Sequence, residues 1–299
     1  MIKLVACDLD GTLFDDTHQL PLENVNAIQE AMEQGVTFMV ATGRNYKSVA
    51  PYFQRHKIHC SCLLLNGALI CDSDGNTIFE LLMKQDATRA VMKLLEREGL
   101  CFHVYAHDGL ITTNGARGVI EFKKHMASRG MSEEEIEELM ETSTFGQYDR
   151  EVESVDAYLK EEPRVYKIET FGSNSQKLAE VREKLMEIQG VAVTNSVADN
   201  IEVTDLYAQK GHSLHKFCEA NNLNPKEIAV IGDSLNDLSM MELFENSIAV
   251  ANATPQILKA ANYRTLRNTE FGVAHALRRI IAENAGGEKA FHISQNKVK

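Results

Sequence analysis

Residues 2–12 read IKLVACDLDGT, and this stretch decides the fold. Its first part, Ile2–Ala6, is an apolar run without helical periodicity, which is typical of a strand buried on both faces of a sheet. Pro21–Gln34 follows with apolar residues at helical spacing, and Val36–Ala41 is a second apolar run. Strand, helix and strand in this order make a βαβ unit. The sequence therefore predicts an α/β protein with a parallel sheet and right-handed crossovers.

The pattern changes twice along the chain. Residues 84–195 mix amphipathic helices with hairpin signals such as Asp108-Gly109, which indicates an inserted α+β domain. Strand-like runs over 200–204 and 228–232 then resume the parallel pattern. We therefore expect three parts: a core domain of residues 1–83 and 196–299, a frayed tail within it from about residue 284, and an inserted domain of residues 84–195.

Composition limits the function. The chain has 299 residues, of which 44% are hydrophobic, and its formal charge is −12. This acidic balance argues against nucleic acid or an anionic membrane as the main partner, because both need a basic surface. It leaves a small phosphate substrate open. No apolar run is long enough to span a membrane, and Asp8 and Asp10 interrupt the N-terminal run before it could act as a secretory signal. The six cysteines form no CxxC pair, which favours the reduced thiols of a cytoplasmic protein.

Four short segments fall where strands of the predicted sheet end, which is the edge where such sheets bind ligands. They are Asp8-Leu9-Asp10-Gly11-Thr12, Thr42-Gly43, Lys210-Gly211 and Gly232-Asp233-Ser234-Leu235-Asn236-Asp237. Each segment alone is weak evidence, because Asp-Gly is most often a turn, Thr a helix cap and Lys a surface charge.

Together the segments carry four carboxylates: Asp8, Asp10, Asp233 and Asp237. They would repel one another if they converged, and a divalent cation would remove this conflict. Mg²⁺ suits such a site, because it binds hard oxygen ligands, water and a substrate phosphate. Thr42 and Lys210 offer a hydroxyl and a point charge for phosphate oxygens. A carboxylate beside Mg²⁺ and a bound phosphate can act as a nucleophile and form an aspartyl phosphate.

This ordered set resembles the haloacid dehalogenase-like (HAD) hydrolases, since it combines DxDGT, Thr, Lys and GDxxND in the order of that family. The resemblance covers roughly residues 1–82 and 196–282. Ala41-Thr42-Gly43-Arg44 and Asn66-Gly67 look like the Cof-like branch in particular. The resemblance implies a Rossmann-like parallel-sheet core. It also implies an inserted α+β cap between Thr42 and Lys210 that selects the substrate.

By this resemblance, Asp8 is the nucleophile, and Asp10 is the general acid and later the base for the attacking water. Mg²⁺ would be bound by the Asp8 carboxylate, the Asp10 backbone carbonyl and Asp233. Asp237 would act on the metal directly or through a water.

The resemblance also assigns a second group to phosphate or substrate: Thr42, Gly43, Lys210, Asn236, Asn66 and Arg44. Thr42 and Lys210 would bind phosphoryl oxygens, and Asn236 would contact the phosphate or support a residue that does. Asn66 and Arg44 are candidates for the substrate side, with a turn residue and a surface charge as equal alternatives.

The leading hypothesis is a Mg²⁺-dependent phosphatase for small phosphorylated metabolites such as sugar phosphates, FMN or pyridoxal phosphate, a range supplied by the resemblance. One alternative is a phosphomutase or phosphotransferase acting on sugar phosphates. Another is a non-catalytic regulator that binds phosphometabolites, against which the presence of both Asp8 and Asp10 argues. A dinucleotide-dependent dehydrogenase is disfavoured, because no GxGxxG follows the first strand. The sequence leaves the physiological substrate, the cap residues that select it and the oligomeric state open.

Overall fold

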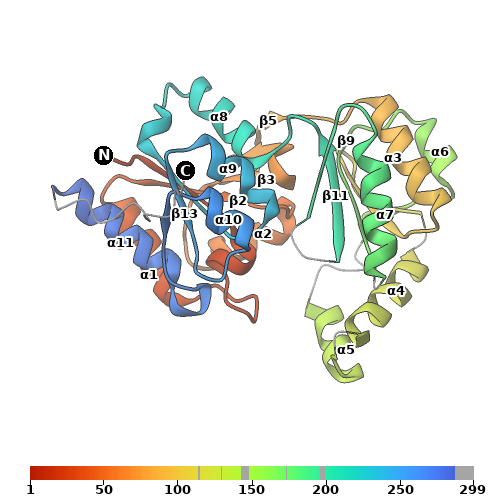
Figure 1. Cartoon of the computed structure of the whole chain (residues 1–299), viewed down its shortest axis with the longest axis horizontal. Coiled ribbons are helices and arrows are strands. Elements are labelled where there is room, and N and C mark those ends of the chain that lie inside the picture. The colour runs from red at the N-terminus through yellow and green to blue at the C-terminus, as the bar shows by residue number, and fades with distance from the viewer. Residues whose placement is uncertain (114, 129, 143–147, 173, 196–198, 287–299) are drawn as a thin grey trace. The chain divides into compact units, whose positions relative to one another are not determined.

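The structure, a computed structural model, describes residues 1–286 except 114, 129, 143–147, 173 and 196–198. The chain divides into two compact units (Figure 1). The core unit consists of Met1–Glu80 and the residues from Gln209 onward. The inserted unit consists of Leu81–Ala208.

An eight-stranded sheet forms the centre of the core unit, in the order β14-β13-β12-β1-β2-β3-β4-β5. The strands from β14 to β3 are parallel, whereas β4 and β5 pair antiparallel at one edge. The bounds are β1 (Leu4–Cys7), β2 (Thr37–Ala41), β3 (Ser61–Leu64), β4 (Leu69–Cys71), β5 (Thr77–Glu80), β12 (Ile228–Gly232), β13 (Asn246–Ala249) and β14 (Tyr263–Arg264). The predicted α/β class with a parallel sheet is confirmed.

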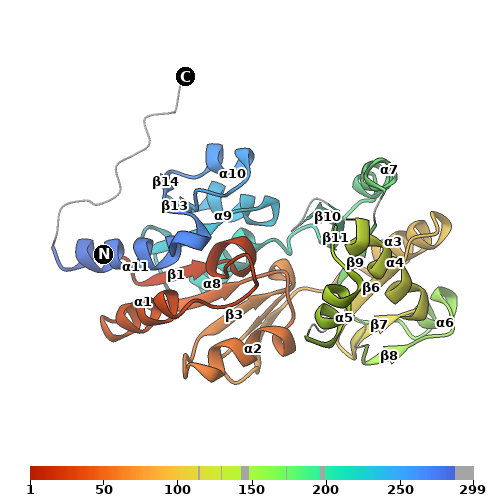
Figure 2. The same ribbon diagram turned by 90° about the horizontal axis from the view of Figure 1, so that it is seen from below.

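Helices cover both faces of this sheet. They are α1 (Leu22–Glu33), α2 (Tyr46–Arg55), α8 (Lys210–Ala220), α9 (Leu238–Leu243), α10 (Pro255–Ala260) and α11 (Gly272–Asn284). Helices α1 and α11 pack together on one side, and α8 and α9 pack together on the other (Figures 1 and 2). This arrangement follows from right-handed crossovers in a sheet whose first strand is central. Every residue of β1 is buried, which explains its apolar sequence without alternation.

Residues 61–71 form a hairpin. It consists of β3, a short 3₁₀ turn over Leu65–Gly67, and β4, which returns antiparallel to β3. Asn66 takes a positive φ of 59°, a conformation that Asn tolerates better than most residues. The residues of this turn therefore reverse the direction of the chain.

The inserted unit is built on a six-stranded sheet, in the order β10-β11-β9-β6-β7-β8. The strands are β6 (Phe102–Ala106), β7 (Gly109–Thr112), β8 (Arg150–Glu151), β9 (Val165–Phe171), β10 (Val191–Thr194) and β11 (Asn200–Asp205). The helices are α3 (Gln85–Arg97), α4 (Gly115–Ser128), α5 (Glu133–Thr142), α6 (Val155–Leu159) and α7 (Ser175–Met186). Apolar residues of α3 and α7, among them Val91, Leu95, Val181 and Leu185, form one buried cluster with Ile168 and other residues of the sheet.

The inserted unit begins three residues earlier and ends thirteen residues later than the predicted 84–195. The later end corrects the assignment of the strand over 200–204 to the core. That segment is β11, and it pairs antiparallel with β9 and β10 in the inserted sheet. An apolar run predicts a strand but does not identify the sheet that the strand joins.

The last described helix contacts the start of the chain. Asn284 is the last residue of α11, and its side chain accepts a hydrogen bond from Ile2 N and donates one to Ile2 O, both at 2.7 Å. Asn284 is therefore held in the core unit, and residues 287–299 of the tail that we expected to fray lie outside the described part. Among the described residues, no helix is long and apolar enough to cross a membrane.

Candidate active site

Asp8 directly follows β1, and a tight turn carries the chain away from it. Residues Leu9–Leu13 form one turn of π-helix that is broken at Asp10 and Gly11. Gly11 has a φ of +78°, and a Cβ there would lie 2.7 Å from Oδ2 of Asp233. Any other residue would be strained and would also clash with Asp233. This glycine therefore allows the ends of β1 and β12 to come close together.

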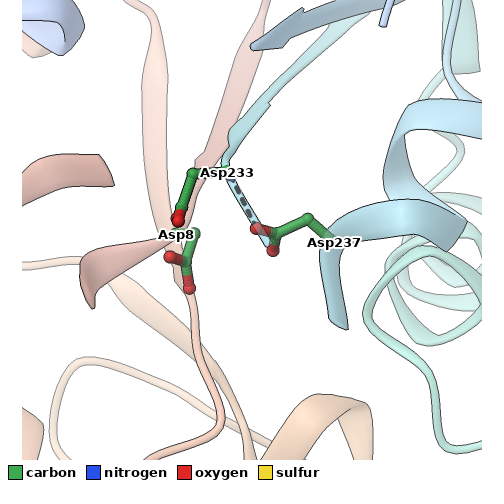
Figure 3. A group of neighbouring side chains, drawn as sticks. All are labelled: Asp8, Asp233 and Asp237. Atoms are coloured by element: carbon green, nitrogen blue, oxygen red, sulfur yellow. Dashed lines mark hydrogen bonds between the residues drawn. The ribbon is translucent and has the colours of Figure 1, made fainter. Parts of the chain in front are cut away.

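Three of the four predicted carboxylates converge at these strand ends. One oxygen from each of Asp8, Asp233 and Asp237 lies within 4.8 Å of the others, and Figure 3 shows the three side chains gathered where β1 and β12 end. Asp237 lies in the 3₁₀ turn before α9, where its Oδ2 accepts hydrogen bonds from Asp233 N at 2.9 Å and Ser234 N at 3.1 Å. The turn after β12 thus fixes Asp237 against the backbone of its neighbour.

Lys210 supplies the cation of this cluster. It is the first residue of α8 and is fully buried. Its Nζ donates to Asp8 Oδ1 at 2.6 Å and to Asp237 Oδ1 at 2.7 Å. Burial lowers the pKa of Lys210, but the charges of Asp237 and Asp8 outweigh it and raise that pKa above its usual value. Lys210 therefore stays charged between two carboxylates.

The cluster still holds more negative than positive charge. Burial raises the pKa of Asp8 well above its ordinary value, and Asp237 and Asp233 add to this effect against the opposing charge of Lys210. Burial and the charge of Asp237 also raise the pKa of Asp233 to about 7. Three carboxylates beside one lysine are a donor set of hard oxygens with surplus charge, which fits a hard divalent cation such as Mg²⁺.

The fourth carboxylate, that of Asp10, does not join this group. Its carboxylate accepts hydrogen bonds from Arg44 Nε at 2.8 Å and Arg44 Nη2 at 2.5 Å, and His18 Nδ1 lies 3.1 Å from Oδ1. Burial raises the pKa of Asp10, but the hydrogen bonds from His18 and Arg44 outweigh it and hold that pKa well below its usual range. Asp10 is therefore ionised in this arrangement. Arg44 is an ion-pair partner of Asp10, and the surface-charge alternative is wrong.

The remaining predicted residues lie at the ends of neighbouring strands. Thr42 follows β2 and is buried, and its hydroxyl accepts a hydrogen bond from Arg44 N at 3.2 Å. Gly43 lies between these two residues in the loop after β2. Asn66 is a turn residue that also contacts two other predicted residues, because its backbone N donates to Thr42 O at 3.1 Å and its Oδ1 accepts from Asn236 Nδ2 at 3.2 Å. The four loops after β1, β2, β3 and β12 are therefore joined by side-chain contacts.

Sequence reasoning assigned no role to two residues that contact predicted site carboxylates. Thr12 Oγ1 donates to Asp233 Oδ1 at 2.7 Å. Thr12 belongs to the DxDGT motif, so its position there was the available signal. His18, the second partner of Asp10, belongs to no motif and could not have been found from spacing.

The fold and the site together define a class of enzyme. A family model described as haloacid dehalogenase-like hydrolase matches residues 5–277, so the chain belongs to that family. The predicted family is therefore confirmed.

Individual relatives narrow the class. Phosphatase YwpJ of Bacillus subtilis is 29% identical over 94% of this chain and 100% of its own length. The 5-amino-6-(5-phospho-D-ribitylamino)uracil phosphatase YwtE of the same organism is 26% identical over 94% of this chain and 99% of its own. The solved structure of a haloacid dehalogenase-like hydrolase from B. subtilis superposes with a TM-score of 0.82 at 27% identity, over 93% of this chain and 100% of that one. The relatives confirm the predicted enzyme class, a hydrolase of the phosphatase kind.

Proposed function

We propose that the protein is a Mg²⁺-dependent phosphatase that hydrolyses small phosphorylated metabolites through an aspartyl-phosphate intermediate. The observation that carries this proposal is the buried cluster in which Lys210 contacts Asp8 and Asp237 beside Asp233. Such an arrangement can bind both a cation and a phosphate dianion while keeping one carboxylate in place for attack.

The reaction would proceed in two halves. In the first, a carboxylate oxygen of Asp8 bonds to phosphorus, the bond from phosphorus to the leaving oxygen breaks, and that oxygen takes a proton from Asp10. In the second, a water gives a proton to Asp10 and attacks phosphorus, and the bond to Asp8 breaks. Inorganic phosphate leaves, with Asp8 ionised and Asp10 protonated again.

The ion pair with Arg44 has a consequence for Asp10. A carboxylate paired with Arg44 and His18 is ionised, so it is ready to act as a base and not as an acid. The acid role in the first half therefore requires that the pair opens and that Asp10 takes up a proton before the leaving group departs. Thr42 and Lys210 would meanwhile bind the phosphoryl oxygens.

Asp8, the backbone carbonyl of Asp10 and Asp233 would hold the metal. Asp237 would act through a water, because its Oδ1 already accepts from Lys210 and its Oδ2 from two backbone N–H groups. When bound, Mg²⁺ neutralises charge on the phosphate and on the carboxylates, which lets two anions approach each other.

The inserted unit, Leu81–Ala208, would act as the cap that selects the substrate. Sugar phosphates, FMN, pyridoxal phosphate and the phosphorylated ribitylaminouracil named for YwtE are the first substrates to test. We place the protein in the cytoplasm, without a nucleic acid or membrane partner, which the six free cysteines and the charge of −12 support.

The test is phosphate release from this substrate panel with Mg²⁺, with EDTA and with Asp8→Asn. Asp72→Asn is the matched control, because it makes the same chemical change in a hairpin turn of the core unit. We expect Mg²⁺-dependent release that Asp8→Asn abolishes and Asp72→Asn leaves intact. Isomerised product without free phosphate would point to a mutase, and unchanged release by Asp8→Asn would refute the proposal.

A further inference from the structure

We propose that Asn252 and Asn268 are positioning residues that hold the loop after β1, and with it the backbone of Asp10, in the place from which its carboxylate, once released from Arg44, reaches the leaving group. This inference rests on the proposed function. Both residues come from loops near the end of the core sheet, more than 200 positions after the loop that they hold. Neither belongs to the four motif segments.

Asn252 fixes the peptide that follows Gly11, the residue next to Asp10. Its Nδ2 donates to Gly11 O at 2.7 Å. Its segment is anchored on the other side, because Thr254 N donates to Asp233 O at 2.9 Å. Asn252 therefore bridges the glycine that follows Asp10 to the loop that carries a carboxylate of the cluster.

Asn268 holds the same loop from a second position, and we call the pair Asn252 and Asn268 the clamp. Its backbone N donates to Asn252 Oδ1 at 2.9 Å, which orients the amide of Asn252 so that its nitrogen faces Gly11. Its own Nδ2 donates to Phe14 O at 3.1 Å and to Asp16 Oδ1 at 3.0 Å, and the residue is buried. The clamp thus grips the loop at two carbonyls, Gly11 O and Phe14 O.

Both contacts of the clamp, at Gly11 O and at Phe14 O, affect the position of Asp10. Gly11 populates positive and negative φ with similar ease, so a contact is needed to keep its peptide in one orientation. The ring of Phe14 lies under the guanidinium of Arg44, with 5.4 Å from Cζ to the ring centroid, and Arg44 binds the Asp10 carboxylate. The nucleophile is held differently, because Asp8 continues from a central strand and contacts buried Lys210. Loss of the clamp should therefore affect Asp10 far more than Asp8.

Two substrates can distinguish an effect on Asp10 from an effect on Asp8. An alkyl phosphate expels a poor leaving group that needs the proton of Asp10, whereas p-nitrophenyl phosphate expels a stable phenolate that does not. The value of kcat/KM covers only the steps up to departure of the leaving group, so the later base role of Asp10 does not enter. The ratio of kcat/KM for the two substrates is also independent of the folded fraction in a preparation.

We expect Asn252→Ala to lower kcat/KM for a sugar phosphate by about tenfold to a hundredfold and that for p-nitrophenyl phosphate by less than about threefold. Asp10→Asn should change the ratio in the same direction. Asn252→Asp keeps the acceptor for Asn268 N but places an oxygen against Gly11 O, so it should behave like Asn252→Ala. Asn262→Ala is the matched control, because Asn262 Nδ2 also donates to a backbone carbonyl of the core unit, Glu245 O at 2.9 Å. It should leave the ratio unchanged.

The outcomes are distinguishable. An equal loss on both substrates, or a ratio that Asn252→Ala does not move, overturns the positioning role and leaves Asn252 as a structural residue. If the wild-type protein hydrolyses neither substrate, the proposed function itself fails, whatever the variants do.

Discussion

Each unit of the molecule buries a lysine between two carboxylates. In the core unit, Lys210 contacts Asp8 and Asp237 at 2.6 and 2.7 Å. In the inserted unit, Lys167 contacts Glu202 and Glu169 at 2.8 and 3.0 Å. Both lysines are almost completely buried, and neighbouring carboxylates raise the pKa of both against the effect of burial. Both clusters therefore consist of a buried, charged lysine that contacts two carboxylates.

Their surroundings differ. Around Lys167, Glu169 also accepts hydrogen bonds from Tyr105 and Asn200, both at 3.1 Å, and its pKa is lowered because Lys167 outweighs its burial. Around Lys210, the third carboxylate Asp233 adds negative charge, and the pKa of Asp8 and of Asp233 is raised. In the inserted unit one lysine faces two carboxylates, whereas in the core unit one lysine faces three, which leaves more surplus negative charge for a cation to neutralise. This difference separates a structural charge network from a site.

The largest difference between the two clusters is expected in enzymatic activity. Asp8→Asn should lower kcat/KM by at least about a thousandfold, because it removes the attacking oxygen. Its melting temperature should not fall, since the change also relieves repulsion among the three carboxylates. Glu202→Gln in the inserted unit makes the matching change and should keep activity per folded molecule within about threefold. Phosphate release and thermal unfolding of both variants check this, and activity of Asp8→Asn near that of wild type would contradict it.

A second test concerns stability. Lys167→Met should lower the free energy of unfolding by about 3–5 kcal/mol, because it leaves the buried Glu202 and the half-buried Glu169 without their cation. Lys160→Met, at an exposed position of the same unit, is the control and should stay within about 0.5 kcal/mol. Urea unfolding followed by circular dichroism measures both. A small effect of Lys167→Met would mean that this cluster is not a structural network.

A third test uses the metal without any substrate. Saturating Mg²⁺ should stabilise the wild-type protein, by about 2.7 kcal/mol at a hundred times its dissociation constant. Asp233→Asn should lose most of this gain, whereas Asp72→Asn should retain it. Thermal unfolding with and without Mg²⁺ gives the result. An equal gain in Asp233→Asn would place the cation elsewhere.

A fourth test uses pH, in protein kept free of metal by EDTA. Asp233 titrates near pH 7 when folded and near its ordinary value of 3.8 when unfolded. Between these values the folded protein holds a proton that the unfolded chain has lost, so its free energy of unfolding falls as the pH rises from about 4 to about 7 and levels off above.

Asp233→Asn lacks this titration. Its melting temperature should therefore rise relative to that of the wild type across the same interval, and added Mg²⁺ should remove the difference. A constant difference from pH 4 to pH 7 would show that Asp233 does not titrate in this range.

Much of the fold and part of the site could be predicted from sequence. Apolar runs located β1, β2 and β12, and residues at the ends of parallel strands must share one edge, so the meeting of Asp8, Asp233 and Asp237 followed from strand order. The pairing of Asp10 with Arg44 did not follow. It depends on how one π-helical turn aims a side chain, and no spacing rule describes that turn.

The same limit explains the misplaced strand β11. Its apolar residues fit either sheet, and only the antiparallel register with β9 assigns it to the inserted unit. The roles of Asn252 and Asn268 could not be predicted from the sequence for a related reason. A single asparagine in a loop carries no signal until its amide has a partner, and these partners lie more than 200 residues away in the chain.

The central place of β1 affects how the chain can fold during synthesis. It lies between β2 and β12, with Leu4 opposite Ile228. About 220 residues must be made before this partner exists, which takes on the order of ten to forty seconds at common translation rates. Until then one edge of an apolar strand has no neighbour in the sheet, and such an edge is prone to pair with other chains. A ribosome-bound N-terminal half should therefore depend on chaperones far more than the released protein does.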